Sequence, residues 1–97
     1  MRYEIILAPE AVEDMHRLKA YLRALPRDTI ETHLRHTPKK ESKSRIKRLR
    51  GVRRPQYRLR VDELRIFYDV IEETVEILAI VPKSQAAAWL AQMGEPT

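Results

Sequence analysis

The chain has 97 residues, with 19 Lys and Arg, 14 Asp and Glu and a formal net charge of +5. This length supports one modest core, because domains usually contain about 100–150 residues. The chain has no cysteine, which excludes disulfides, thiolate metal ligands and a cysteine nucleophile. Apolar runs fall far short of the roughly 18 residues of a membrane span, and Glu4 comes too early for a signal peptide. We therefore expect one soluble, cytoplasmic domain over residues 1–97.

The positive charge is concentrated in the middle of the chain. Residues 39–65 contain 12 Lys and Arg and three acids, which gives +9, whereas the other residues hold 7 bases and 11 acids, which gives −4. A solvated lysine-rich loop is one interpretation of this segment. Most of its bases are arginines, however, and the planar guanidinium fits phosphate oxygens. The segment therefore favours a nucleic-acid partner.

The N-terminal part predicts a strand followed by two helices. Residues 3–7 (YEIIL) are typical of a short strand, and Pro9 suits the first position of a helix. Apolar residues at three- and four-residue steps then predict one amphipathic helix over residues 10–25, which Pro26 ends. These residues are Val12, Met15, Leu18, Leu22 and Leu25. A second helix is expected over residues 27–35, and an exposed loop over residues 39–44.

The second half of the chain changes to a period of two, which is typical of strands. Strands are expected over residues 46–50, 56–61, 64–70 and 74–81, and a short helix over residues 83–93 with Ser84 as its N-cap. This element order predicts an α+β fold. In it, an N-terminal strand and a helical hairpin pack on a mainly antiparallel sheet of four to five strands, and a short C-terminal helix follows.

Three arginines are the candidate functional residues. Arg58 and Arg60 lie two apart on a strand, so they project from one face about 7 Å apart. Arg65 joins them if the next strand folds back alongside. Three guanidinium groups on one face make a phosphate clamp. The alternative is a row of solvent-facing arginines balanced by carboxylates, for which Asp69 and Glu76 are the nearest candidates.

Aromatic residues interleave with this basic face, and single-stranded RNA is held by stacking as well as by phosphate contacts. Phe67 shares the face of Arg65 and is a candidate for stacking on a base, whereas Tyr57 points to the opposite face and is expected in the core. Trp89 is expected to anchor the C-terminal helix to the sheet. The flanking basic residues expected to contact RNA are Lys47, Arg48, Arg50, Arg53 and Arg54.

The three histidines, His16, His33 and His36, all fall in the predicted helical hairpin, away from the arginines. His33 and His36 have a spacing that could hold a metal, but no third ligand matches it, so surface positions are the better interpretation. No glycine-rich phosphate loop and no nucleophilic Ser, His and Asp set is present. We expect neither a metal site nor a cofactor.

The ordered segments YEIILAPEAVEDMHRL, IKRLRG, YRLRV, LRIFYDV and VEILAIV resemble the RelE/ParE toxin superfamily of bacterial type II toxin–antitoxin systems. The resemblance covers nearly the whole chain and implies a small α+β fold and an antitoxin partner. RelE-like members cleave mRNA in the ribosomal A site, and ParE-like members poison DNA gyrase. We expect a RelE-like, ribosome-dependent endoribonuclease that inhibits translation. A ParE-like gyrase inhibitor and a non-catalytic nucleic-acid-binding member are the alternatives.

The resemblance also implies roles for individual residues. Arg58 and Arg60 match the basic pair of this strand, and Arg65 matches the arginine that stabilises charge on the scissile phosphate. After the last strand, RelE-like members carry further basic residues and then a tyrosine or histidine, whereas this chain offers only Lys83. The proton acceptor is expected to be Glu63 or Lys83, unless the ribosome moves the protons.

Overall fold

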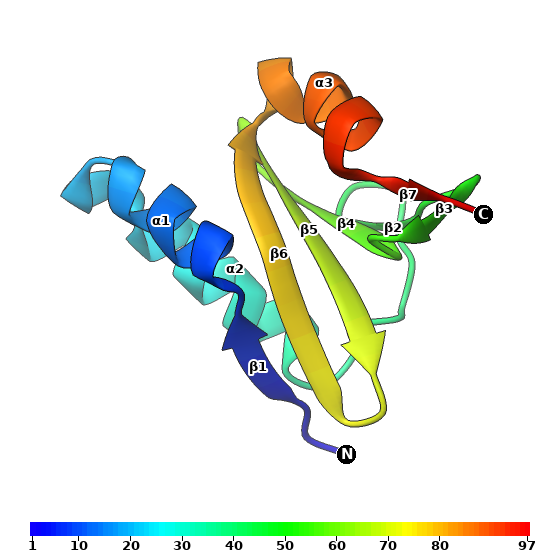
Figure 1. Cartoon of the computed structure of the whole chain (residues 1–97). Helices are drawn as coiled ribbons and strands as arrows, with labels where there is room; N and C mark the ends of the chain where they lie inside the picture. Colours follow the sequence, from blue (N-terminus) through cyan, green and yellow to red (C-terminus); the bar gives the residue numbers. More distant parts are fainter.

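Two helices and a five-stranded sheet form the main layers of the computed structural model, which describes residues 1–97 (Figure 1). This architecture confirms the predicted α+β class. None of its helices is long and apolar enough to cross a bilayer. The elements are β1 (Glu4–Leu7), α1 (Pro9–Arg17), the 3₁₀ helix η1 (Ala20–Leu22), α2 (Ala24–Leu34), β2 (Ile46–Arg48), β3 (Val52–Arg54), β4 (Tyr57–Val61), β5 (Leu64–Ile71), β6 (Thr74–Pro82), α3 (Lys83–Met93) and β7 (Glu95–Pro96).

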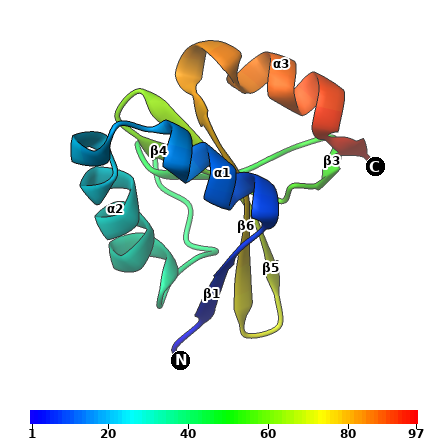
Figure 2. The ribbon, with the colours of Figure 1, turned by 60° about the vertical axis from the view of Figure 1, so that its left-hand side comes forward.

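The main sheet has the strand order β1-β6-β5-β4-β2. Only β1 and β6 pair in parallel, and the other three pairs are antiparallel. A parallel pair requires a long crossover connection. The connection from β1 to β6 starts with the helices α1 and α2, which lie on one face of the sheet (Figure 2). The predicted mainly antiparallel sheet is confirmed, with the apolar strand β5 at its centre and β6 beside it.

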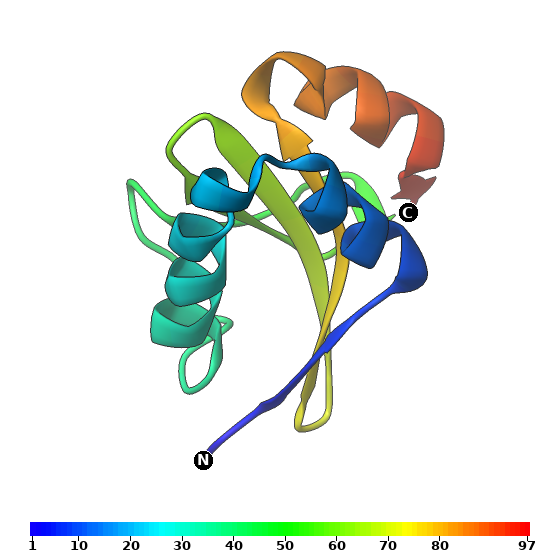
Figure 3. The same ribbon diagram turned by 90° about the vertical axis from the view of Figure 1, so that its left-hand side faces the viewer.

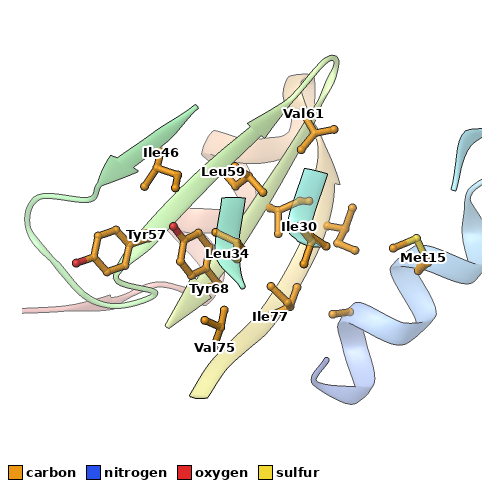
Figure 4. Close-up of a cluster of buried hydrophobic side chains, with 13 residues drawn as sticks. Met15, Ile30, Leu34, Ile46, Tyr57, Leu59, Val61, Tyr68, Val75 and Ile77 are labelled. Atoms are coloured by element: carbon orange, nitrogen blue, oxygen red, sulfur yellow. The ribbon is translucent and has the colours of Figure 1, made fainter. Parts of the chain in front are cut away.

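The larger core lies between this sheet and the helices α1 and α2 (Figure 4). Alternation along β4 turns Tyr57, Leu59 and Val61 toward it, and α2 contributes Ile30 and Leu34. The expected core position of Tyr57 is confirmed: its ring stacks on Tyr68 with centroids 5.4 Å apart. The hydroxyl of Tyr68 donates to the Pro38 carbonyl at 2.6 Å, which ties the loop after α2 to the sheet.

The single helix expected over residues 10–25 is wrong. Helix α1 ends at Arg17, because the guanidinium of Arg23 folds back over its C-terminus. Nε of Arg23 donates to the carbonyls of Met15 at 3.2 Å and Leu18 at 3.0 Å, and Nη2 donates to the His16 carbonyl at 2.9 Å. These bonds join the one from the Leu18 N–H to the Met15 carbonyl and supply partners for carbonyls at the end of α1. They therefore stabilise the break.

Pro26 does not end a helix but lies in the first turn of α2, which begins at Ala24. A proline costs little there, because the first N–H groups of a helix have no intrahelical partner. The last two residues of the expected apolar stripe, Leu22 and Leu25, are 45% and 53% exposed. The regular spacing of these apolar residues therefore does not correspond to one buried helix face.

The fold contains two short strands that the sequence pattern does not predict. β3 pairs with β7 in a separate two-stranded sheet that fixes the C-terminus beside residues 52–54. The strand expected over residues 46–50 stops at Arg48 as β2. The bounds of α3 match the expectation, but its N-cap is Pro82 without a side-chain cap, so Ser84 does not have that role.

Candidate functional site

Two rows of opposed residues cross the sheet face that looks away from α1 and α2. In one row Lys47 pairs with Arg58, and Arg58 pairs with Phe67; in the other Arg60 pairs with Arg65. Opposed residues on antiparallel strands project from the same face. The structure thus brings Lys47, Arg58, Arg60 and Arg65 together on β2, β4 and β5. We call these four residues the arginine face.

Arg65 is the best fixed member of the arginine face, with only 6% of its surface exposed. Its Nη1 donates to the Asp62 carbonyl at 2.9 Å and to the Leu64 carbonyl at 2.8 Å. Asp62 has a φ of 52°, which an aspartate adopts more readily than most residues. Arg65 therefore closes the turn between β4 and β5 in addition to placing a positive charge.

Arg58 lies beside two further arginines and has no acidic partner. Its Nε is buried and has no hydrogen-bond partner. Burial lowers the pKa of Arg58, and the positive charges of Arg65 and Arg60 lower this pKa further. Arginine nevertheless stays protonated in proteins. Arg58 thus carries an uncompensated charge on the arginine face.

The carboxylates expected to balance this face bind another arginine. Asp69 Oδ2 lies 3.0 Å from Arg54 Nε, and Glu76 Oε1 lies 2.9 Å from Arg54 Nη2. Asp69 Oδ1 also accepts the backbone N–H of Gln56 at 2.7 Å. The ion pairs of the structure include none to Arg58, Arg60 or Arg65. The interpretation of a balanced row of arginines therefore does not hold.

The other basic residues predicted to contact RNA do not gather on the arginine face. Arg48 projects from the opposite face, where its guanidinium lies 5.1 Å from the ring centroid of Tyr57. Arg53 pairs with Glu95 at 2.8 Å, and Arg54 is held by its two carboxylates. Arg50 is exposed between β2 and β3. Of the flanking residues, only Lys47 joins the arginine face.

Phe67 does not fit the stacking role expected for it. It is fully buried, and its ring stacks on Trp89 with centroids 4.7 Å apart. The second core cluster, of Phe67, Ala79 and Val81, lies under α3. The anchoring role expected of Trp89 is thereby confirmed. No face of the Phe67 ring is left for a nucleic-acid base.

Two groups that can move protons lie at the end of the sheet beside Arg65. The backbone N–H of Lys83 donates to the Glu63 carbonyl at 2.7 Å, which places the start of α3 next to the turn between β4 and β5. Both residues are exposed. The histidines, in contrast, lie on α1, on α2 and just after it.

Sequence reasoning missed Arg45 as a member of this region. The Arg45 carbonyl accepts from the backbone N–H of Arg60 at 2.8 Å, and Nη1 of Arg45 donates to the Arg60 carbonyl at 3.0 Å. The register of β2 against β4 would have indicated this position of Arg45. Continuing the register from Ile46 and Leu59 by one step places Arg45 opposite Arg60.

A helical pair packed on one face of a mainly antiparallel sheet is the small α+β fold that the resemblance to toxins of the RelE/ParE superfamily implies. Residues 5–87 match the model of a family described as the ParE toxin of the type II toxin–antitoxin system, parDE. The chain belongs to this family of toxins, which confirms the predicted superfamily. No curated protein matches the chain.

Two solved structures share the fold. One is the RelB–RelE antitoxin–toxin complex from Methanococcus jannaschii, with a TM-score of 0.66, 20% identity and coverage of 87% of this chain and 96% of that chain. The other is the archaeal RelE–RelB complex from Pyrococcus horikoshii OT3, with a TM-score of 0.64, 22% identity and coverage of 88% and 99%. At these identities the likeness concerns the fold.

Proposed function

We propose that this toxin binds the backbone of mRNA on its arginine face and cleaves it in the ribosomal A site, which inhibits translation in the cytoplasm. The observation that carries the proposal is the state of Arg58, whose buried Nε has no partner and whose charged neighbours are Arg60 and Arg65. Buried polar groups in native proteins are nearly always hydrogen-bonded. A phosphate bound by the Arg58 guanidinium would supply the compensating charge.

The chemistry that suits an arginine face is attack by the RNA on itself. The 2′ oxygen attacks the adjacent phosphorus, and the bond from phosphorus to the 5′ oxygen of the next nucleotide breaks. The protein needs no nucleophile, and its task is to orient the RNA and stabilise the charge that develops on the phosphate. Arg58 and Arg60 contact the phosphate in this proposal. Arg65, fixed by two backbone carbonyls, adds charge without having to reorganise.

Proton transfer falls to the two groups beside the face. Arginine is effectively never deprotonated, so none of the three arginines serves as a general base. We assign Glu63 as acceptor of the 2′-hydroxyl proton and Lys83 as donor to the leaving 5′ oxygen. Both side chains are exposed at the end of the sheet that Arg65 occupies.

The test is cleavage of ribosome-bound mRNA by purified toxin, read by primer extension. We expect Arg58→Gln and Arg60→Gln to slow cleavage by roughly 100-fold or more, the effect of removing a donor that stabilises developing charge. Arg2→Gln is the matched control, because Arg2 is exposed near the opposite end of the sheet. A wild-type toxin that leaves ribosome-bound mRNA intact overturns the proposal.

Inhibition of DNA gyrase is the second candidate function. The match to the ParE family model favours it. It also requires no proton transfer, which suits a site whose best placed groups are arginines. A supercoiling assay with purified gyrase separates the two functions. Gyrase poisoning with unchanged translation would favour this candidate over mRNA cleavage.

We further propose that an antitoxin neutralises this chain through an acidic segment that covers the arginine face. Both solved structures named above, which have a similar fold, are antitoxin–toxin complexes. A free segment of charge +9 would also bind nucleic acid indiscriminately at low salt. The product of the neighbouring small gene is therefore expected to co-purify with the toxin and to restore growth. Failure in both assays would exclude that product as the antitoxin.

A further inference from the structure

The two edges of the five-stranded sheet differ in how their backbone groups are satisfied. At the β2 edge, the preceding loop covers the outward groups. The Ile46 carbonyl accepts from the N–H of Ser42 at 3.0 Å, and the N–H of Arg48 donates to Glu41 Oε1 at 2.8 Å. Proteins commonly cover sheet edges in this way, because unpaired strand groups are templates for another strand. The β2 edge is closed by the chain itself.

The β1 edge, in contrast, is open over Ile5 and Leu7. The N–H groups of Glu4 and Ala8 donate to β6-side carbonyls, of Glu73 and Ile77, at 2.8 Å each. Bonding alternates along a strand of a parallel pair, so Ile5 and Leu7 direct their N–H and C=O groups away from β6. These groups have no partner in the structure. Figure 3 looks at this edge and shows no other segment in front of β1.

The open stretch begins just after a position that the chain does cover. The N–H of Tyr3 donates to the Arg35 carbonyl at 2.7 Å, and Nη1 of Arg35 donates to the Tyr3 carbonyl at 2.9 Å. The end of α2 thus occupies the edge at Tyr3 and leaves the next two outward residues free. An added strand would have a defined place to start.

A pocket lies beside this open edge, between β1, α1 and α2. Its apolar lining consists of Ile5, Leu7, Met15 and Ile30. Arg27 is exposed in its wall and has no ion-pair partner, whereas Glu31, the one acidic residue of the wall, is bound by Arg35. The pocket therefore offers an apolar surface with one uncompensated positive charge.

We propose that an extended segment of the antitoxin adds to the sheet as a further strand along β1. The main chain of this segment pairs with Ile5 and Leu7, its alternate apolar side chains enter the pocket, and a carboxylate binds Arg27. Main-chain bonds provide affinity in such strand addition, and alternate side chains provide specificity. A second copy of this chain is a poorer occupant, because two molecules of charge +5 repel each other. The inference rests on the antitoxin partnership proposed above.

Amide hydrogen exchange on the wild-type protein tests this without any substitution. In the free toxin, the amides of Ile5 and Leu7 are expected to exchange fast, while those of Ile6 and Ala8 are slow. When the neighbouring gene product binds, all four are expected to become slow. If it binds while Ile5 and Leu7 still exchange fast, the strand addition is wrong and the partnership stands. Protection that depends on toxin concentration alone would assign the edge to a second copy and also overturn the proposal.

A charge reversal tests the side-chain part of the proposal. Arg27→Glu is expected to weaken binding of the neighbouring gene product on the order of tenfold. Lys19→Glu is the matched control, because it makes the same charge change at an exposed position outside the pocket, and it should have less than about a twofold effect. Equal losses of binding for both variants would contradict the proposal that a carboxylate of the antitoxin binds Arg27. If the product does not bind wild-type toxin at all, the partnership and this inference both fail, whereas the mRNA cleavage assay is unaffected.

Discussion

Arg60 and Arg65 lie directly opposite each other on β4 and β5, two positive side chains paired across an antiparallel ladder. Like charges in this position destabilise a sheet by about 0.2–1 kcal/mol. Arg58, on the same face, adds a third charge, and no carboxylate compensates for it. The folded protein therefore maintains a repulsive cluster that a bound anion relieves.

The first prediction follows from this repulsion. Arg60→Gln is expected to raise the free energy of unfolding by about 0.5 kcal/mol, because it removes one of two opposed charges. It is also expected to abolish toxicity. Urea denaturation and a growth assay measure the two effects. Phosphate should stabilise wild type more than the variant, and a variant less stable than wild type would refute the idea of stored repulsion.

The second prediction concerns Arg65, which closes a turn as well as placing a charge. Arg65→Met keeps much of the length of the side chain but loses the donors to Asp62 and Leu64. The free energy of unfolding should fall by about 1–3 kcal/mol, since two partly buried hydrogen bonds of about 0.5–1.5 kcal/mol each are lost. Arg58→Gln removes a charge from the same face without this turn contact, so it should change stability much less. Equal stability of the two variants would show that the turn does not depend on Arg65.

The third prediction concerns the contact between Phe67 and Trp89. Trp89→Ala removes the ring that covers Phe67 and should destabilise the protein by about 3 kcal/mol. Trp89→Phe is the control that retains an aromatic ring and should lose much less. Thermal unfolding measures stability, and amide exchange in α3 shows whether the helix has separated from the sheet. If α3 stays protected in Trp89→Ala, its anchor lies elsewhere.

The fourth prediction is a pH dependence at Asp69. Burial raises the pKa of this carboxyl above its ordinary 3.8, although the Gln56 backbone N–H and the Arg54 charge act in the opposite direction. A raised pKa means that the folded state holds the proton more tightly than the unfolded state. The contribution of Asp69 to stability is therefore full below 3.8 and declines as pH rises through the folded pKa.

Asp69→Asn removes this titration while keeping the shape of the side chain. The stability of wild type minus that of the variant should fall as pH rises from 3.8 through the folded pKa of Asp69. Urea denaturation across this range provides the measurement. A difference that grows with pH would show that the Arg54 ion pair outweighs burial and that the pKa of Asp69 is lowered in the folded protein.

Local pattern was sufficient to predict the strands and the shared face of Arg58, Arg60 and Arg65. Alternation along β4 places Leu59 in the core and Arg58 and Arg60 on the other face, and a tight turn to β5 leaves little choice of register. The match of residues 83–93 to α3 has the same origin, because Pro82 ends the strand and helix-forming residues follow.

Several of the errors occur where residues distant in the chain decide the outcome. Alternation along β5 places Phe67 on the same face as Arg65, which predicts an exposed position. Trp89, 22 positions later in the chain, buries it. Asp69 on β5 forms an ion pair with Arg54 on β3, and no local spacing in the sequence indicates this pair. The pairing of β3 with β7 involves segments too short to show a period.

The cap formed by Arg23 indicates that residues 10–25 encode two competing structures. Their apolar spacing favours one uninterrupted helix, whereas three carbonyl contacts from a single guanidinium favour a bent hairpin. The Arg23 side chain thus decides between one continuous helix and two helices joined by a bend. Loss of Arg23 is therefore expected to let α1 extend through η1. Strand β1 is joined directly to α1, so it would then be the first strand to lose its pairing with the sheet.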